Sequence, residues 1–452
     1  MQLTPLPYRP DSAILFAPFA TEPWSLWLDS GSSRSYGDRY DILLAAPLAT
    51  LLTDSQCRSY LQLRQGAIEP LQGDPFMLAQ QLLQRWQWPN PPAELPFGGG
   101  LAGYWGYELN SAYPSELPQM ALGLYGWAVV VDHLRQQSWW VVMLPEAYAT
   151  AELQALRARL LAPERFSRAF DTAPFTTVGQ LSHSLTNAEY HHAFGRIQHY
   201  LRQGDCYQIN LTRRYSIRYR GDPWHAYCGI RQRQSAPFGA FMRLPQGEAL
   251  LSHSPERFLR VSADGEVVTE PIKGTRPRHA QAERDQQLAR ELQLSCKDRA
   301  ENVMIVDLLR HDIGRHCDIG SVKVPALCAL QSHPNVHHLV STVTGRLSAK
   351  SSPLQLLADA FPGGSVTGAP KIRAMEIIAE LEHGARNLYC GSLGYVSADG
   401  RMETNIAIRS AYTHHHRIHF HAGGGITIGS DSEQEYAEME QKAQFFIDYF
   451  AT

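Results

Sequence analysis

The stretch YCGSLGYVSADGRMETNIAIRSAYTHHHRIHFHAGGGITI, Tyr389 to Ile428, alternates short apolar runs with turn residues. Asp399-Gly400 and His414 to His416 separate these runs, and this pattern predicts a β-meander. From Leu250 onward such strand patterns mix with helical ones. The chain is therefore expected to have an α+β fold.

The first part of the chain has a different character. From Ser25 to about Val142 it is rich in Trp, Tyr and Gly, with strand-like runs such as GLYGWAVVVDH and WWVVMLP. Residues 151–184 then pass from a helical pattern into a polar stretch without clear periodicity. We place a boundary here and predict a β-rich unit over 1–165 and a second unit over 166–452.

The second unit offers clear signals for individual elements. Thr186 and Glu189 form a capping box before an apolar helical stripe that ends near Gly204. A strand is expected at CYQINLTRRYSIRY, directly after that glycine. The last helix, EQEYAEMEQKAQFFIDYF, carries acids early and aromatic residues late, so its C-terminal part is expected to face the core.

Composition restricts the classes of function. The 452 residues are 44% hydrophobic and 19% charged, with a formal charge of −3. This balance gives no basic surplus for binding nucleic acid. The seven cysteines contain no CxxC pair, which favours a reducing compartment, and we expect the cytoplasm. The first residues do not resemble a signal peptide, and no apolar run is long enough to span a membrane.

The stretch EPIKGTRPR, Glu270 to Arg278, places a lysine beside a glycine. The residues before it alternate as in the end of a strand, and Gly274 breaks the pattern. We therefore expect Thr275 to Pro277 to form a loop, with Lys273 at the mouth of the strand. From this stretch alone, Lys273 is either a solvated surface charge or a functional group.

Two helical segments repeat a pair of acids at a spacing of three residues. Asp298 and Glu301 share a face in CKDRAENVMIVDLLRHDIG, and Glu435 and Glu438 share a face in the last helix. Carboxylates that converge from two helices suit a hard cation such as Mg²⁺. The alternative is that these acids are solvated helix faces.

Two glycine-rich stretches could approach a ligand closely. PGGSVTGAPK, Pro362 to Lys371, precedes a predicted helix start, where backbone N–H groups can hold an anion. It lacks the Lys and Ser/Thr of a Walker A loop, and an ordinary helix entry is the alternative. Gly423 to Gly425 allow close backbone approach to a ligand or merely a bulge. HExxH, GxSxG and CGxC contexts are missing, so zinc hydrolysis and acyl transfer have little support.

Taken together, several motifs resemble those of the chorismate-utilising enzymes. They are SPERF (254–258), PIKGT (271–275), AENVMIVDLLRHDIG (300–314), HHLVS (337–341), FPGGSVTGAPK (361–371), IAIRS (406–410) and AGGGI (422–426). They occur in the order of that family over roughly residues 186–450. The resemblance implies two lobes of packed antiparallel sheets flanked by helices, similar to anthranilate synthase component I, with the active site in the C-terminal lobe.

Within this family the lysine of PIKGT is typical of members that aminate C4 of chorismate, whereas anthranilate synthases have alanine there. The resemblance therefore implies that Lys273 is a nucleophile and that the product is 4-amino-4-deoxychorismate, for folate synthesis. A lysine that attacks C2 and displaces the C4 hydroxyl, followed by ammonia at C4, divides one difficult substitution into two steps. Glu256 is similar to the general acid/base of the family, and His338 to the histidine beside the leaving group.

The resemblance also implies ligands for substrate and metal. Mg²⁺ would be held directly by Glu301 and Glu438, and through water by Asp298 and Glu435, although relatives often have glutamate at the position of Asp298. The residues implied in substrate binding are Tyr395, Arg409, Gly423, Gly424, Gly425, Thr275 and Ser365. The alternation of the chain places Arg409 opposite the apolar face of Ile406 and Ile408.

A partner and a second ligand are implied in the same way. The chain has no Cys-His-Glu glutaminase unit, so a separate glutamine amidotransferase subunit is expected to supply ammonia. WLDSGSS (27–33) lies where relatives bind tryptophan, and the expected pocket contains Asp29, Ser30, Pro237 and Phe238. Two alternatives remain open: an anthranilate synthase component I, and an inactive amino-acid-binding regulator that uses only this pocket.

Overall fold

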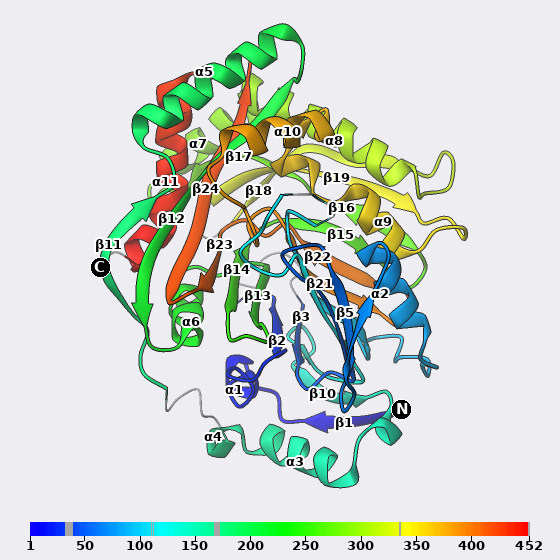
Figure 1. Ribbon diagram of the computed structural model, residues 1–452. Coiled ribbons are helices and arrows are strands. Elements are labelled where there is room, and N and C mark those ends of the chain that lie inside the picture. The colour runs from blue at the N-terminus through cyan, green and yellow to red at the C-terminus, as the bar shows by residue number, and fades with distance from the viewer. Residues whose placement is uncertain (32–38, 110, 112, 167–171, 334–335, 451–452) are drawn as a thin grey trace.

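The computed structural model describes residues 1–452 except 32–38, 110, 112, 167–171, 334–335 and 451–452. Within these residues the chain forms two large antiparallel sheets, covered on their outer sides by helices (Figure 1). The first sheet runs in the order β1 (Gln2–Leu6), β10 (Gln137–Val142), β9 (Trp127–Asp132), β3 (Tyr40–Leu44), β2 (Leu26–Asp29), β13 (Phe238–Arg243), β14 (Ala249–Ser254), β23 (Ser410–His414), β24 (Arg417–Thr427), β12 (Gln208–Arg220) and β11 (Thr176–His183), with β20 (Gly368–Ala369) also paired to β12.

The second sheet has the same number of strands and also mixes early and late parts of the chain. It runs in the order β17 (Ile272–Pro277), β19 (Val336–Arg346), β16 (Glu266–Thr269), β15 (Arg257–Val261), β22 (Met402–Asn405), β21 (Ser392–Ser397), β7 (Gly100–Trp105), β8 (Met120–Tyr125), β4 (Ala49–Thr53), β5 (Ser59–Leu63) and β6 (Ile68–Leu71), with β18 (Lys323–Ser332) also paired to β19.

Helices connect the strands and cover the sheets (Figure 1). The α-helices are α1 (Ala13–Phe16), α2 (Pro75–Gln84), α3 (Thr150–Leu161), α4 (Pro163–Phe166), α5 (Asn187–Gln203), α6 (Pro223–Arg233), α7 (Ala282–Leu294), α8 (Cys296–Gly314), α9 (Pro353–Ala360), α10 (Lys371–Leu381) and α11 (Ser432–Phe450), and the short 3₁₀ turns are η1 (Pro145–Ala147) and η3 (Gly364–Val366). No helix in the described part of the chain is long and apolar enough to cross a membrane. The predicted α+β class with packed antiparallel sheets and flanking helices is confirmed.

Both sheets extend across the predicted boundary at residue 165. In the first sheet β2 pairs with β13, with Leu28 opposite Ala240. In the second sheet β7 pairs with β21, with Ala102 opposite Tyr395. The boundary itself stays a prediction, but the two predicted units share their hydrogen-bonded sheets and therefore their core.

The predicted meander over 389–428 has the expected strands and turns, but it is divided between the two sheets. β21 and β22 form a hairpin in the second sheet, and β23 and β24 form a hairpin in the first. Residues 406–409 pass from one sheet to the other, and Arg409 at the end of this passage has a φ of 47°. The alternation of apolar residues specifies a strand but does not specify its partner, so the sequence could not reveal this crossing.

The helices predicted from capping residues and from apolar and acidic spacing are present in the structure. Thr186 caps α5 through a complete capping box with Glu189, and Gly204 ends it with a φ of 82°. The helices expected around 296–314 and 433–450 are α8 and α11, and the strand expected at 206–219 is β12. The polar stretch 176–183, which was not predicted as a strand, is β11, an edge strand. Its side chains are mostly exposed, so it lacks the alternation that marks a half-buried strand.

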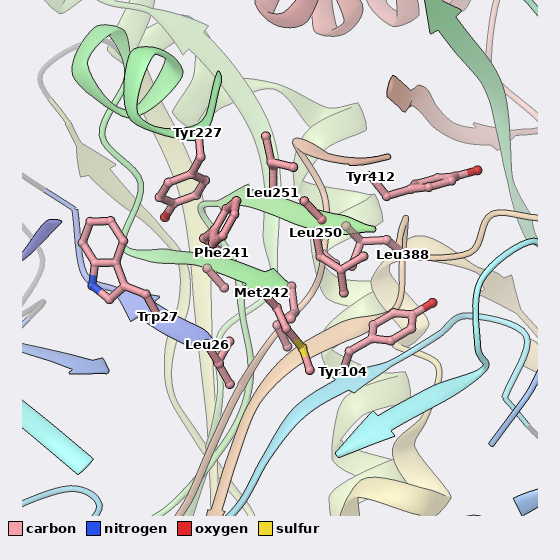
Figure 2. Close-up of a cluster of buried hydrophobic side chains, with 14 of the residues drawn as sticks. Leu26, Trp27, Tyr104, Tyr227, Phe241, Met242, Leu250, Leu251, Leu388 and Tyr412 are labelled. Atoms are coloured by element: carbon pink, nitrogen blue, oxygen red, sulfur yellow. The ribbon is translucent and has the colours of Figure 1, made fainter. Parts of the chain in front are cut away.

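The buried hydrophobic side chains form two clusters, and the larger one contains many aromatic side chains from both sheets and from the helices that cover them. Figure 2 shows Trp27, Tyr227 and Phe241 close together, whereas Tyr104 from the second sheet lies beside Met242. The rings of Trp27 and Tyr227 are 5.6 Å apart in an edge-to-face arrangement, and those of Tyr227 and Phe241 are also 5.6 Å apart. Burial of these large rings ties the N-terminal strand β2 to α6 and β13, which are distant in sequence.

Candidate active site

Lys273 lies inside a strand, which corrects the expectation for this stretch. The alternating residues before it divide into β16 and β17, and β17 continues through Thr275 to Pro277 instead of ending in a loop. The register shifts between Lys273 and Thr275 opposite β19, and Gly274 has a φ of 77°. A β-carbon at Gly274 would lie 2.9 Å from Asp298, so only glycine fits this bulge. Bulges re-aim neighbouring side chains, and here the bulge sets the direction of Lys273.

Lys273 and Glu256 meet at one residue of the glycine-rich loop. The Nζ of Lys273 donates to the backbone oxygen of Ser365 at 2.7 Å. The hydroxyl of Ser365 donates to Oε1 of Glu256 at 2.8 Å. Glu256 is almost completely buried at the start of β15, whereas Lys273 is half-buried. Three segments that are distant in sequence therefore converge on an amine and a carboxyl group.

The environment shifts both groups toward their neutral forms. Burial lowers the pKa of Lys273, and the nearby charges of Glu301 and Glu256 oppose this shift. Burial also raises the pKa of Glu256 to about 7, with Lys273 and the Ser365 hydroxyl opposing it. A neutral amine can act as a nucleophile, and a protonated carboxyl group can act as an acid near neutral pH. Both shifts favour the protonation states that displacement of a hydroxyl group needs.

The predicted acidic residues do converge from two helices, together with two lysines. Glu435 is buried on α11 and accepts from Lys297 Nζ at 2.6 Å and from Ser430 at 2.7 Å. Glu438 pairs with Lys442 at 2.8 Å. Among the described residues, no three Asp, Glu, His or Cys side chains are arranged as a metal site. In this structure Glu435 and Glu438 each form an ion pair with a lysine.

Glu301, on α8, faces both Lys273 and the acids of α11. Burial raises its pKa; the charges of Lys273 and Lys297 oppose this, while Glu435 and Asp298 add to it. Asp298 is at the start of α8, where it accepts from Arg276 at 3.3 Å. Glu301 therefore interacts electrostatically with the amine of Lys273 and with the carboxylates of Glu435 and Asp298.

Thr275, His338 and Arg409 form a second group of polar side chains. The hydroxyl of Thr275 is 2.9 Å from Nδ1 of His338, its partner across β17 and β19. Burial lowers the pKa of His338 to about 3, and the charge of Arg409 adds to this effect. The guanidinium of Arg409 has neither an ion-pair nor a hydrogen-bond partner within the described ranges. A buried cation of this kind suits an anionic ligand.

The three glycines of β24 differ in what surrounds them. A β-carbon at Gly423 would lie 2.2 Å from the oxygen of Leu211, and one at Gly425 would lie 2.1 Å from the side chain of Gln208. These two glycines are required by the close approach of β12. Gly424 instead faces Glu435 and Lys442, and Lys442 donates to the Gly423 oxygen at 3.1 Å. Of the three glycines, only Gly424 therefore has the side of its Cα that lacks a side chain next to Glu435 and Lys442.

Lys371, at the end of the other glycine-rich stretch, has a structural role. Its Nζ donates to Asp312 at 3.0 Å and to the oxygen of Ala360 at 2.7 Å. Within residues 362–371 it is Ser365 that contacts Lys273 and Glu256.

A separate cavity of about 550 Å³ contains the residues predicted to bind tryptophan. Asp29, Ser30, Pro237 and Phe238 line it, and so does Tyr395. The structure thus groups Tyr395 with this cavity and not with Lys273 and Glu256.

The side chains of Asp29 and Ser30 in this cavity already form hydrogen bonds with other residues of the protein. Asp29 accepts from Arg231 Nε at 2.6 Å and from Tyr227 at 2.9 Å. The hydroxyl of Ser30 donates to Asp41 at 2.6 Å. Ser32 and Ser33 of the same stretch lie outside the described residues. Tryptophan binding stays a prediction.

Comparison with known proteins agrees with this geometry. The family model described as chorismate binding enzyme matches residues 28–448. The chain belongs to the chorismate-binding enzyme family. It is 44% identical to aminodeoxychorismate synthase component 1 of Klebsiella aerogenes, over 97% of this chain and 96% of that protein. Its identity to the protein of the same name from Escherichia coli K12 is 41%, over 96% and 95% of the two chains.

A solved structure supports the fold. The crystal structure of anthranilate synthase component I from Streptococcus pneumoniae TIGR4 superposes with a TM-score of 0.78 at 29% identity, over 90% of this chain and 91% of that one. The resemblance to chorismate-utilising enzymes that the sequence motifs indicate is therefore confirmed.

The sequence motifs of this chorismate-binding enzyme did not indicate the two lysines that pair with Glu435 and Glu438. Lys442 follows Glu438 by four residues on α11, so helical spacing alone could have indicated the pair. Lys297 belongs to a different helix from its partner Glu435. Only the packing of α8 near α11 brings these two residues together.

The raised pKa of Glu256 leads to a prediction about stability. Its pKa is about 7 in the folded chorismate-binding enzyme, compared with an ordinary value of 4.5. Between these values the folded state retains a proton that the unfolded state has lost, so the free energy of unfolding falls as pH rises through this window. Glu256→Gln cannot ionise and should not show this fall. From pH 5 to pH 8 we expect wild type to lose up to about 3 kcal/mol relative to the variant.

Urea denaturation at both pH values measures this difference. Glu283→Gln, at an exposed position on α7, is the matched control and should follow wild type. An equal pH dependence in wild type and Glu256→Gln would show that the Glu256 carboxyl group has an ordinary pKa.

Proposed function

We propose that this chain is component 1 of an aminodeoxychorismate synthase, which converts chorismate and ammonia to 4-amino-4-deoxychorismate and water. The observation that carries the proposal is the placement of Lys273 and Glu256 on either side of Ser365, the amine with a lowered pKa and the carboxyl group with a raised one. Relatives that match nearly the whole chain bear this name.

In the first step the neutral amine of Lys273 attacks C2 of chorismate. Both ring double bonds shift, the C4–O bond breaks, and Glu256 gives its proton to the departing hydroxyl group, which leaves as water. The proton that the amine loses as its new bond forms passes to the Glu256 carboxylate, so the proton balance of the step closes. The product is a covalent adduct between Lys273 and the ring.

In the second step ammonia attacks C4. Both double bonds shift back, the bond between C2 and Lys273 breaks, and one proton of the incoming nitrogen returns to the lysine amine. The two steps together exchange the C4 hydroxyl for an amino group and regenerate the free amine. Without a lysine at this position, ammonia would attack C2 directly, which is the anthranilate reaction.

Chorismate carries two carboxylates, and the proposed site offers groups for both. Arg409 supports the binding of one because it is a half-buried cation without a protein partner in the described part of the chain. His338, held by Thr275, would lie beside the C4 hydroxyl as a neutral imidazole. The open side of Gly424 leaves room for the ring next to Lys442.

The acidic residues support a magnesium ion. Their oxygen atoms are the ligands that Mg²⁺ prefers, and Glu301 experiences the charges of Glu435 and Asp298. Glu301 and Glu438 would hold the ion directly, with Asp298 and Glu435 acting through water. When bound, the ion would supply positive charge that holds a ring carboxylate beside the acids.

The name component 1 of these relatives supports a second component. We propose that it is a glutamine amidotransferase subunit, which releases ammonia for this chain. The seven free cysteines suit a reducing compartment, and we place the reaction in the cytoplasm.

Product analysis tests the proposed function. With chorismate, Mg²⁺ and ammonium chloride, the purified chain should form a product with nitrogen at C4, and mass spectrometry with fragmentation should distinguish it from anthranilate. Glutamine should not replace ammonium for the isolated chain. Anthranilate as the main product would favour the alternative activity, and the absence of any turnover would favour an inactive regulator.

A further inference from the structure

The two residues that follow Ser365 are tied to distant parts of the chain. Arg386 Nη1 donates to the backbone oxygen of Val366 at 3.0 Å, and the backbone N–H of Asn210 donates to the oxygen of Thr367 at 2.8 Å. Both donor residues are buried, with exposed fractions of 1% for Arg386 and 6% for Asn210. The backbone that carries Ser365 is therefore fixed on its C-terminal side.

Close packing fixes the same backbone on its N-terminal side. A β-carbon at Gly364 would lie 2.4 Å from the side chain of Leu308 on α8, so this glycine approaches the helix as closely as the chain allows. The hydroxyl of Thr367 donates to the oxygen of Gly363 at 3.1 Å and closes the turn η3 around Ser365. Ser365 itself is buried in this turn.

Ser365 contacts the acid and the amine of the proposed reaction through different atoms. Its hydroxyl group donates to Oε1 of Glu256 at 2.8 Å, and its backbone oxygen accepts from Nζ of Lys273 at 2.7 Å. A substitution of the side chain can therefore remove the contact with Glu256 and leave the contact with Lys273 in place.

The first step of the proposed reaction needs both contacts. The hydrogen bond to the backbone oxygen restricts rotation of the Lys273 amine and so the direction of its lone pair. Burial raises the pKa of Glu256 to about 7, and the Ser365 hydroxyl opposes this rise because a donor stabilises the ionised carboxylate. A proton donor is most effective when its pKa lies near the working pH. Without this hydroxyl, Glu256 would be a weaker acid.

We propose that Ser365 is a further catalytic residue: its backbone oxygen directs the amine of Lys273, and its hydroxyl group supplies the hydrogen bond that keeps Glu256 an effective proton donor. The inference rests on the proposed function, since it assigns Ser365 a part in displacing the C4 hydroxyl. This role differs from the substrate binding that the family resemblance implies for the same residue.

Two titratable side chains of the described residues interact with Glu256. The charge of Lys273, on β17, lowers the pKa of Glu256. Cys390, shortly before β21, has its pKa raised to about 12, mainly by burial and in part by the charge of Glu256, so its thiol is neutral near pH 7. Substitution of the Ser365 side chain leaves both groups in place.

The test compares three variants of the full chain. Ser365→Ala removes the hydroxyl group, and Ser365→Thr retains one. Thr367→Val is the matched control, because it removes a hydroxyl that contacts backbone oxygens of the same turn. The kcat/KM for chorismate is measured with saturating ammonium from pH 6 to pH 9. Each value is divided by that of wild type at the same pH, so that the ionisation of ammonium cancels.

At pH 6, Ser365→Ala should be at least about 30-fold slower than wild type, because its proton donor is weaker. Its relative rate should then rise about tenfold toward pH 9, because Glu256 without the hydroxyl donor keeps its proton to higher pH. Ser365→Thr and Thr367→Val should each show a relative rate that does not change with pH.

Urea denaturation follows the same proton without turnover. The pKa of Glu256 in the folded state lies above its ordinary value of 4.5, so the free energy of unfolding falls as pH rises from the ordinary value to the folded one. In wild type this fall should end near the folded value. In Ser365→Ala it should continue to higher pH, and in Ser365→Ala combined with Glu256→Gln it should be absent.

The same pH dependence in Ser365→Ala and wild type, in either measurement, would overturn the proposal. An equal rise of the relative rate in Thr367→Val would also overturn it, because disturbance of the turn would then be sufficient. The proposed function fails by a different result: wild type would form no product with nitrogen at C4 from ammonium, whatever the variants show in urea.

Discussion

Lys273→Ala should lose at least about 1000-fold in the rate of 4-amino-4-deoxychorismate formation, because the variant lacks the nucleophile that displaces the C4 hydroxyl. The wild-type protein, given chorismate and Mg²⁺ without ammonia, should accumulate an adduct on the peptide that contains Lys273. Intact-mass and peptide mass spectrometry detect it. In the variant the adduct should vanish, and residual product should shift toward a 2-amino isomer.

Two further variants separate a nucleophile from a positioning charge. Lys273→Arg keeps a positive charge but cannot attack, because a guanidinium stays protonated, so it should be almost inactive. Lys323→Ala, at an exposed position of β18, is the matched control and should behave as wild type. Two results together would contradict a nucleophilic role: the wild-type enzyme forms product without any detectable adduct, and Lys273→Ala still places nitrogen at C4. Lys273 would then only orient the substrate.

Removal of Mg²⁺ should abolish turnover. The carboxylates of α8 and α11 lie next to the site proposed for the dianionic substrate, and without the ion they would repel its ring carboxylate. Excess chelator should reduce the rate by more than about 100-fold, and Mg²⁺ added beyond the chelator should restore it. Steady-state rates with ammonium as nitrogen source provide the measurement.

Glu301→Gln tests the same ion through binding. The variant should need a much higher Mg²⁺ concentration for half-maximal rate, and calorimetric titration of Mg²⁺ should show weaker binding. Asp307→Asn, on an exposed part of the same helix, should leave both unchanged. Full activity in excess chelator, or unchanged Mg²⁺ binding in Glu301→Gln, would remove these acids from a metal site.

Local signals in the sequence predicted the elements well. The capping box at Thr186 and the glycine at 204 fixed the ends of α5, because both act through backbone groups within one turn of the helix. The acid spacing predicted which carboxylates share a face of α8 and α11. The strand β11 was missed because its exposed side chains give no alternating pattern.

The candidate site was predicted in its chemistry and less well in its geometry. Lys273, Glu256 and Ser365 converge as the motifs indicate. The bulge at Gly274 was read as the end of a strand, since a glycine with positive φ marks a turn or a bulge equally well. Tyr395 lies at the other cavity, because a side chain on a two-faced strand can serve either side of the sheet.

By itself the sequence determined the family, the class of fold and the positions of α5, α8, α11 and β12, because these depend on residue type and on spacing over one or two turns. Only the tertiary structure decided that residues 389–428 divide between two sheets and that Lys297 pairs with Glu435 across two helices. Strand partners and contacts between helices are set by the best burial of the whole chain, and local alternation is compatible with many such arrangements.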